Sequence, residues 1–117
     1  MSSTWFKIDS ALPGDVTIAA GQPNRQAGLT SLLIIPAAAV GVQWKSINPG
    51  VSTVNLSGSM TIGGTGNGYE LPLAPGGARG ELPGAYIMAQ PGDNLVLTLG
   101  SGSIQVSGHG TYSLFPV

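Results

Sequence analysis

The chain has 117 residues and few charges: four Lys or Arg, five Asp or Glu, and a net charge of −1. Charged residues make up 8% of it, against about 25% in an ordinary globular domain, so it has no cluster of cations to neutralise a nucleic-acid backbone. A surface with a net charge near zero is weakly protected against association. This favours a protein that packs against its own copies or a partner over a free monomer with a Ser-, Thr-, Asn- and Gln-rich surface.

The chain contains no cysteine, which excludes disulfides and thiolate metal sites. Its longest apolar run, Leu32 to Val42, is interrupted by Pro36 and Gly41 and is shorter than the roughly 20 residues of a membrane-spanning helix. The first ten residues lack the charged-then-apolar pattern of a signal peptide. We therefore expect a protein made in the cytoplasm without secretion, with neither a membrane nor nucleic acid as a partner.

The N-terminal residues 1–14 are predicted to be an arm or a first short strand, followed by a single domain over residues 15–117. Trp5 and Phe6 are adjacent, so on a strand they face opposite sides. One of the two rings then leaves the local core, and an arm packed on a neighbour would use both.

Residues 16–20 predict a short strand with Val16 and Ile18 inward, and residues 29–35 predict a strand that is apolar on both faces. Such a strand is expected to be buried on both sides, the second side being covered by a loop or by another subunit. One face of this run carries Leu29, Leu33 and Ile35, and the other carries Leu32 and Ile34.

Two longer strands are predicted over residues 37–47 and 51–62, joined by a turn at Asn48, Pro49 and Gly50. Gly58 occupies an inward position of the second strand, which indicates a bulge or a close approach by a bulky neighbour. The other predicted inward residues are Val40, Val42, Trp44, Val54, Leu56, Met60 and Ile62.

The next stretch is rich in glycine and proline. It predicts a flexible tip at residues 63–68, a short strand at 69–73 and an irregular loop at 74–84, which holds Arg79 and Glu81. A strand over residues 85–90 follows, and the sequence from Gln90 to Asp93, QPGD, predicts a type II turn.

Period-2 alternation is strongest between Leu95 and Leu114 and predicts a long antiparallel hairpin. In all, about eight strands with turns every eight to twelve residues predict an all-β antiparallel sandwich or barrel. A jelly roll of about eight strands is the preferred architecture, with an immunoglobulin-like sandwich as the alternative.

The residues encode no recognisable chemistry, and no enzyme activity, cofactor or metal is expected. His109 is the only histidine and lies on the outward side of its predicted strand. Glu70 and Glu81 flank one loop region and could approach each other as in a glycosidase, but solvated loop charges are the favoured interpretation. The sequence GGTGNG lacks the Lys-Ser/Thr ending and the following helix of a phosphate loop.

The segment from Val42 to Phe115 contains the elements VQWKSI, LSGSMTI, YELPLAP, DNLVLTL and IQVSGHGTYSLF, and a V-x-G-x-x-x-Y pattern in the final strand falls on Val106, Gly108 and Tyr112. With these elements the segment resembles small β-sandwich proteins encoded by tailed bacteriophages. The resemblance implies a non-enzymatic virion component: a capsid decoration, or cement, protein that forms jelly-roll homotrimers on the phage head and clamps subunits of the major capsid protein together.

The expected interface residues follow from this interpretation. The strand over residues 29–35, which is apolar on both faces, is expected to line the contacts between subunits. Trp5 and Phe6, or the irregular loop at residues 74–84, are expected to bind the capsid shell. Tyr69, an aromatic residue expected to be exposed beside the glycine tip at residues 63–68, is also the best candidate to contact a ligand in the alternative function, a receptor-binding or carbohydrate-binding module. The interface candidates are Trp5, Phe6, Leu29, Leu33, Ile35, Tyr69, Arg79 and Glu81.

Overall fold

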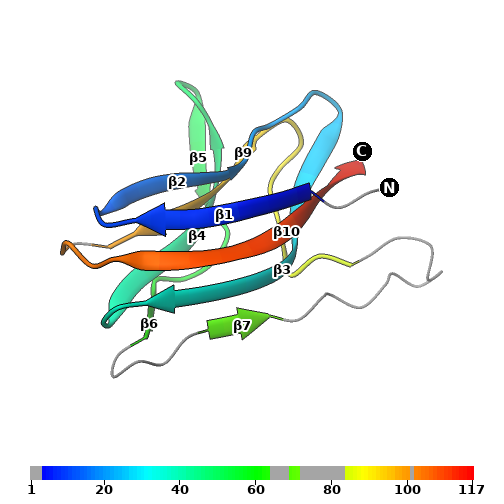
Figure 1. Cartoon of the computed structure of the whole chain (residues 1–117). Helices are drawn as coiled ribbons and strands as arrows, with labels where there is room; N and C mark the ends of the chain where they lie inside the picture. The colour runs from blue at the N-terminus through cyan, green and yellow to red at the C-terminus, as the bar shows by residue number, and fades with distance from the viewer. Residues whose placement is uncertain (1–3, 64–68, 72–83, 101) are drawn as a thin grey trace.

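The computed structural model describes residues 4–63, 69–71, 84–100 and 102–117. Over these residues the chain forms ten strands and no helix, and every strand pairing is antiparallel. The strands make two sheets that pack face to face (Figure 1). The predicted all-β antiparallel sandwich is confirmed.

The first sheet has the order β1 (Thr4–Ser10), β10 (Val106–Pro116), β3 (Arg25–Pro36) and β7 (Tyr69–Leu71), with β8 (Ile87–Met88) also paired to β3. The second sheet has the order β2 (Gly14–Ala19), β9 (Asn94–Leu99), β4 (Val40–Asn48) and β5 (Ser52–Asn55), with β6 (Met60–Ile62) also paired to β4. The first four strands therefore alternate between the two sheets, whereas β4, β5 and β6 share the second sheet and β7 and β8 share the first.

The predicted hairpin between Leu95 and Leu114 is wrong, because β9 and β10 lie in different sheets. The connection between them crosses the sandwich. Gly100 donates its N–H to the carbonyl of Gly41 in β4 over 2.7 Å, and the carbonyl of Gln105 accepts the N–H of Ala37, just after β3, over 2.8 Å. β10 instead pairs with β1 and β3, which lie in the first third of the chain.

The core lies between the sheets and is built from the inward positions of the alternating strands. Trp44 is 2% exposed and Leu97 1%, and the inward placement predicted for Val40, Val42 and Trp44 is confirmed. Removing this apolar surface from water is the main driving force for folding. The strands β1, β2, β3, β4, β9 and β10 all contribute buried residues.

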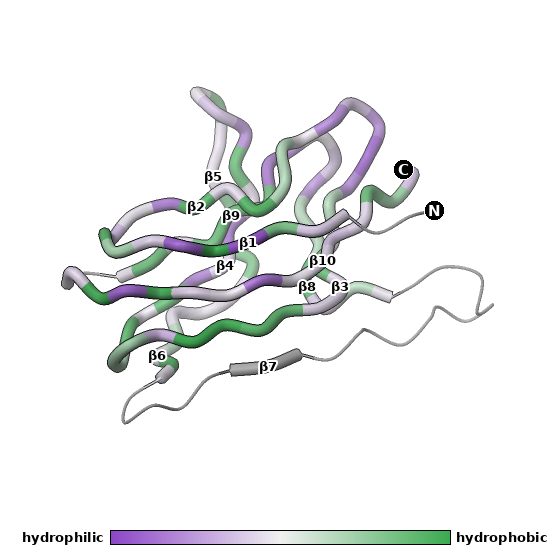
Figure 2. Tube along the Cα trace, viewed as in Figure 1, coloured by the Kyte–Doolittle hydropathy of each residue, from purple (hydrophilic) through white to green (hydrophobic). Residues whose placement is uncertain are grey.

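β3 departs from simple alternation. Its pairing with β10 shifts between Thr111 and Tyr112, which lie opposite Ser31 and Leu29, so Thr30 is an extra residue on β3. An extra residue of this kind changes which side chains face the core. Figure 2 shows that β3 is nevertheless hydrophobic along much of its length.

The consequence of the irregular register is that the predicted faces of residues 29–35 need correction. Leu29 lies in the core at 0% exposure, together with Leu32 and Ile34. Leu33 is half-buried and Ile35 is 49% exposed. The outer side of this strand is therefore not fully buried, contrary to the expectation.

The strand predicted over residues 51–62 is interrupted between β5 and β6, which both pair with β4. Gly58 lies in this interruption, and a Cβ atom added to it would meet no other atom within 4 Å, so the predicted close approach is wrong. The turn at Gln90–Asp93 is confirmed as type II: Gly92 has φ of +81°, and the N–H of Asp93 donates to the carbonyl of Gln90 over 3.0 Å.

Candidate interaction surface

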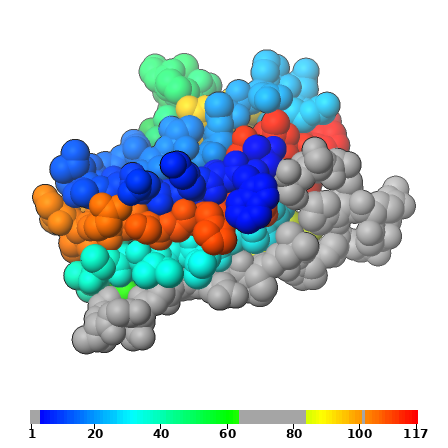
Figure 3. All heavy atoms as spheres, viewed as in Figure 1, coloured from blue at the N-terminus to red at the C-terminus, as the bar shows by residue number. Residues whose placement is uncertain are grey.

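The outer face of the first sheet brings together residues from β1, β10 and β3, which lie side by side in the space-filling view (Figure 3). Three rows of residues cross the strands. In strand order, the rows are Trp5, Thr111 and Ser31; Lys7, His109 and Leu33; and Asp9, Ser107 and Ile35.

Trp5 is the most prominent side chain of this face, with 70% of its surface exposed. Its ring centroid lies 5.4 Å from that of His109, with 43° between the ring planes. Aromatic rings attract each other at such separations. His109, predicted to point outward, is exposed as expected.

Phe6 faces the opposite side, as its position next to Trp5 predicts. It packs against the core, with its ring centroid 6.4 Å from that of Tyr112. A Cβ atom on Gly110 would lie only 2.7 Å from the Phe6 ring, so the glycine makes room for the aromatic side chain. Phe6 is half-buried and belongs mainly to the sandwich.

Trp5, Leu33 and Ile35 form what we call the outer stripe. His109 lies between Trp5 and Leu33, because it contacts Trp5 and lies directly opposite Leu33 on β3. Exposed aromatic and aliphatic side chains on a rigid strand framework are typical anchors of protein interfaces. Leu29, predicted to belong to this group, is buried in the core and offers no surface to a partner.

Polar contacts hold the neighbours of the stripe in place. The Gln105 side-chain amide donates to Asp9 Oδ1 over 2.7 Å, and the hydroxyl of Thr111 lies 2.7 Å from those of Thr30 and Ser31. These contacts link β10 and the turn before it to β1 and β3, so the outer stripe lies on a well-connected part of the sheet.

The remaining interface candidates lie wholly or partly outside the described residues. Arg79 and Glu81 are outside them, and for Tyr69 only the backbone is described, where it pairs with Ile34 at β7. The backbone of Glu70 pairs with Leu33, so its strand position is known, but the predicted approach of Glu70 to Glu81 falls outside the described part of the chain.

One buried polar cluster was not anticipated. The hydroxyl of Ser46 donates to Asp93 Oδ2 over 2.8 Å and accepts the N–H of Gln90 over 2.9 Å. Ser46 is 0% exposed and Asp93 6%. The signal was present in the sequence, since Ser46 continues the inward series of Val40, Val42 and Trp44, and a buried hydroxyl needs a partner.

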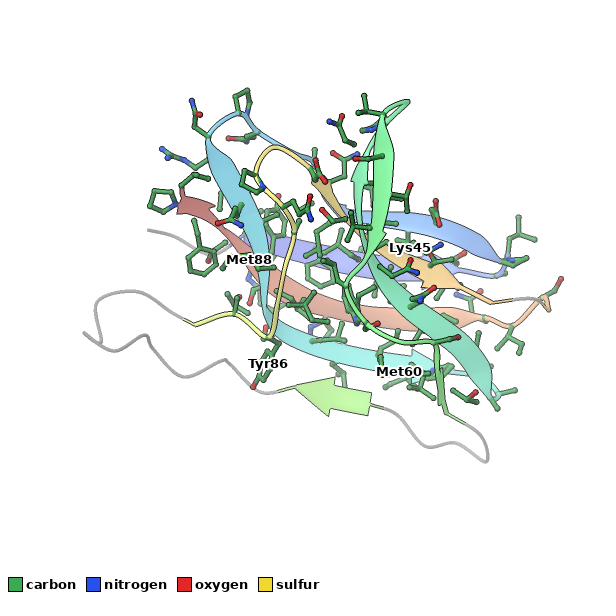
Figure 4. The ribbon with its side chains drawn as sticks, turned by 180° about the vertical axis from the view of Figure 1, so that it is seen from behind. Lys45, Met60, Tyr86 and Met88 are labelled. Atoms are coloured by element: carbon green, nitrogen blue, oxygen red, sulfur yellow. The ribbon has the colours of Figure 1, made fainter. Side chains whose placement is uncertain are left out.

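A second apolar surface lies at the opening between the sheets, seen from behind in Figure 4. Met60 of β6 is 36% exposed, and Tyr86 and Met88, beside and within β8, are each 37% exposed. An apolar crevice opens beside Met60 and has no polar lining residue to orient a ligand. It is lined by Leu32, Ile34, Val42, Trp44, Met60, Ile62 and Leu97.

Within the described ranges, no group of three His, Cys, Asp or Glu residues is placed to hold a metal ion. The same residues include no helix that is long and apolar enough to cross a membrane. Comparison of the chain with protein-family models finds no match, and comparison with curated proteins finds none either.

Proposed function

We propose that this chain is a structural virion protein: a capsid decoration protein that binds the outer surface of a phage head and stabilises contacts between capsid subunits. The proposal rests on the outer stripe, an exposed apolar contact surface on the first sheet of a weakly charged protein. The resemblance of the segment from Val42 to Phe115 to phage β-sandwich proteins points in the same direction.

The jelly-roll architecture belongs to this proposal. The strand orders β1-β10-β3-β7 and β2-β9-β4-β5 support it, because a jelly roll consists of two antiparallel sheets of four strands with repeated crossings between them. The proposed partners are the major capsid protein and other copies of this chain, arranged as a homotrimer. A decoration protein of this kind strengthens the shell by adding interfaces across its seams, and several linked contacts bind far more tightly than one.

The test is co-sedimentation of the purified chain with phage heads assembled without it. We expect binding to be weakened at least tenfold by Trp5→Ala or Ile35→Ser, since interface anchors contribute about 2 kcal/mol or more each and about 1.4 kcal/mol is a tenfold change in affinity. Val51→Ser is the matched control, because Val51 is 76% exposed but lies at the β4–β5 turn, away from the outer stripe. Failure of the unmodified chain to bind the heads would refute the proposal.

A second candidate function, a carbohydrate-binding module, is favoured by one observation. The exposed ring of Trp5 is surrounded on its face by polar residues such as Thr111, Ser31 and Lys7, and sugar-binding sites combine an aromatic platform with hydrogen-bonding groups. A glycan array separates the two functions: glycan binding that disappears with Trp5→Ala supports the module, and head binding without any glycan signal supports the decoration protein.

A further inference from the structure

The edge strand β1 differs from the other edges of the two sheets. All seven of its residues pair with β10 without interruption, from Thr4 opposite Tyr112 to Ser10 opposite Val106, and it contains neither Pro nor Gly. Its other side has no strand neighbour among the described residues. A long, regular edge strand is a template for pairing with another chain.

The other described edges carry the features that usually prevent such pairing. β2, the edge of the second sheet, has a register shift between Thr17 and Ala19 and begins at Gly14. On the far sides of the sheets, β5, β6, β7 and β8 are each two to four residues long. Among the described edges, β1 alone combines length with regularity.

We infer that β1 pairs antiparallel with β1 of a second copy of this chain, about a two-fold axis at Ile8. Antiparallel residues that lie opposite each other share a face of the sheet. The outward residues Trp5, Lys7 and Asp9 of one copy therefore meet the same three residues of the other, and the register decides which of them meet.

Charge selects the register. Full overlap of the two strands places Lys7 opposite Lys7 of the second copy, and like charges directly opposite each other are destabilising. A shift of two residues places Lys7 opposite Asp9 twice, once on each side of the axis, which gives two opposite-charge pairs. The reverse shift places Lys7 opposite Trp5 and leaves both Asp9 carboxylates without a positive partner, so the first shift is favoured.

The surroundings of both residues fit this contact. Lys7 and Asp9 are exposed. Asp9 accepts one hydrogen bond from Gln105 through Oδ1, and an ionised carboxylate has further acceptor sites for an ammonium group. In the inferred register residues 6–10 pair, so Trp5 lies just beyond the paired segment and the outer stripe stays open.

This contact is two-fold and independent of the proposed function. It doubles the mass of a free monomer, and in a trimer it would join each subunit to a subunit of another unit rather than close the trimer. If the chain does not pair through β1, the result of the head-binding test is unaffected, because that test concerns the outer stripe. If the chain does not bind phage heads, the inferred β1 contact is likewise unaffected.

The first experiment is analytical ultracentrifugation of the full chain from about 1 μM to 1 mM, the range of modest protein affinities. The variants are Lys7→Asp, Asp9→Lys and the double exchange Lys7→Asp/Asp9→Lys, with Lys45→Asp on β4 (Figure 4) as a control of equal charge change on the other sheet. We expect the mass to double with concentration, each single variant to raise the dissociation constant by roughly tenfold, and the double exchange and Lys45→Asp to behave as the unmodified chain.

The inference is overturned if the mass does not double in this range, if the double exchange associates as poorly as the single variants, or if Lys45→Asp weakens association equally. Circular dichroism of each variant checks that the sandwich is folded, which is expected because Lys7 and Asp9 are exposed and Lys45 is half-buried rather than in the core.

The second experiment is disulfide cross-linking, for which the chain offers a background without cysteine. In the inferred register, a mixture of Lys7→Cys and Asp9→Cys proteins should form a disulfide-linked pair, since directly opposite Cα atoms lie about 4.5–5.5 Å apart. Lys7→Cys alone should not, because its two copies would be about 8 Å apart. Efficient self-linking of Lys7→Cys without the mixed product would indicate full overlap and overturn the inferred register.

Discussion

The hydroxyl of Ser46 donates a 2.8 Å hydrogen bond to the carboxylate of Asp93 inside the sandwich, between residues 47 positions apart in the chain. Ser46 lies on β4, and Asp93 ends the turn that leads into β9. Because the same hydroxyl also accepts the N–H of Gln90, the contact fastens this turn to the end of the second sheet.

Loss of the buried carboxylate is expected to be costly. Asp93→Ala leaves the Ser46 hydroxyl without its acceptor, and a buried unsatisfied group costs about 1–3 kcal/mol. Asp15→Ala is the matched control, since Asp15 accepts a hydroxyl hydrogen bond from Thr98 over 2.6 Å at an exposed site and should cost no more than about 0.5 kcal/mol. The measurement is the free energy of unfolding in urea, and equal losses for the two variants would contradict the assignment.

Gly110 is predicted to be intolerant of any side chain. A Cβ atom there would collide with the carbonyl oxygen of Ser31 and lie 2.7 Å from the Phe6 ring, so Gly110→Ala should lower stability by about 1–3 kcal/mol through overpacking. Gly58→Ala is the control, because its Cβ would meet no atom within 4 Å and its φ is not positive. Thermal denaturation compares the two, and a Gly110→Ala protein as stable as Gly58→Ala would show that β1 and β10 pack differently.

Trp44 and Trp5 are predicted to differ in their contribution to stability and in their accessibility to a quencher. Trp44 is 2% exposed and Trp5 70%, so Trp44→Ala should cost about 3–5 kcal/mol, whereas Trp5→Ala should cost less than about 1 kcal/mol. Urea denaturation followed by circular dichroism measures both without relying on tryptophan fluorescence. Acrylamide should quench the remaining Trp5 of a Trp44→Phe protein far more than the remaining Trp44 of a Trp5→Phe protein; similar quenching would contradict the assigned burial.

Asn24 is the only described non-glycine residue with a positive φ, at +60°. It follows Pro23 in a turn closed by the N–H of Arg25 donating to the carbonyl of Gln22 over 3.2 Å. Asn24→Gly should be close to neutral, and Asn24→Val should cost about 1–2 kcal/mol because a β-branched side chain resists this conformation. Comparable stabilities for Asn24→Gly and Asn24→Val in thermal denaturation would show that the turn adopts another conformation.

Several parts of the candidate surface could be predicted from local sequence. The adjacency of Trp5 and Phe6 was enough to place them on opposite faces, and the position of His109 in its strand was enough to place it outward. Leu33 and Ile35 were correctly grouped, but Leu29 was not, because the extra residue at Thr30 changes the phase of β3 and depends on its pairing with β10.

Local sequence was sufficient for the all-β class, most of the strands and the inward residues of β4. It was also sufficient for the turns at residues 48–51 and 90–93, each closed by a backbone hydrogen bond, of Val51 N–H to the carbonyl of Asn48 and of Asp93 N–H to that of Gln90. Period-2 alternation and turn chemistry act between near neighbours along the chain. The assignment of strands to sheets required the folded molecule. A connection as short as residues 100–105 is compatible both with a hairpin in one sheet and with a crossing to the opposite sheet. The alternation within β9 and β10 therefore could not distinguish these two arrangements. The sheet of each strand is determined by partners distant in the sequence: β10 pairs with β1 and β3, and β9 pairs with β2 and β4. These pairings, and the burial that accompanies them, exist only once the chain has folded.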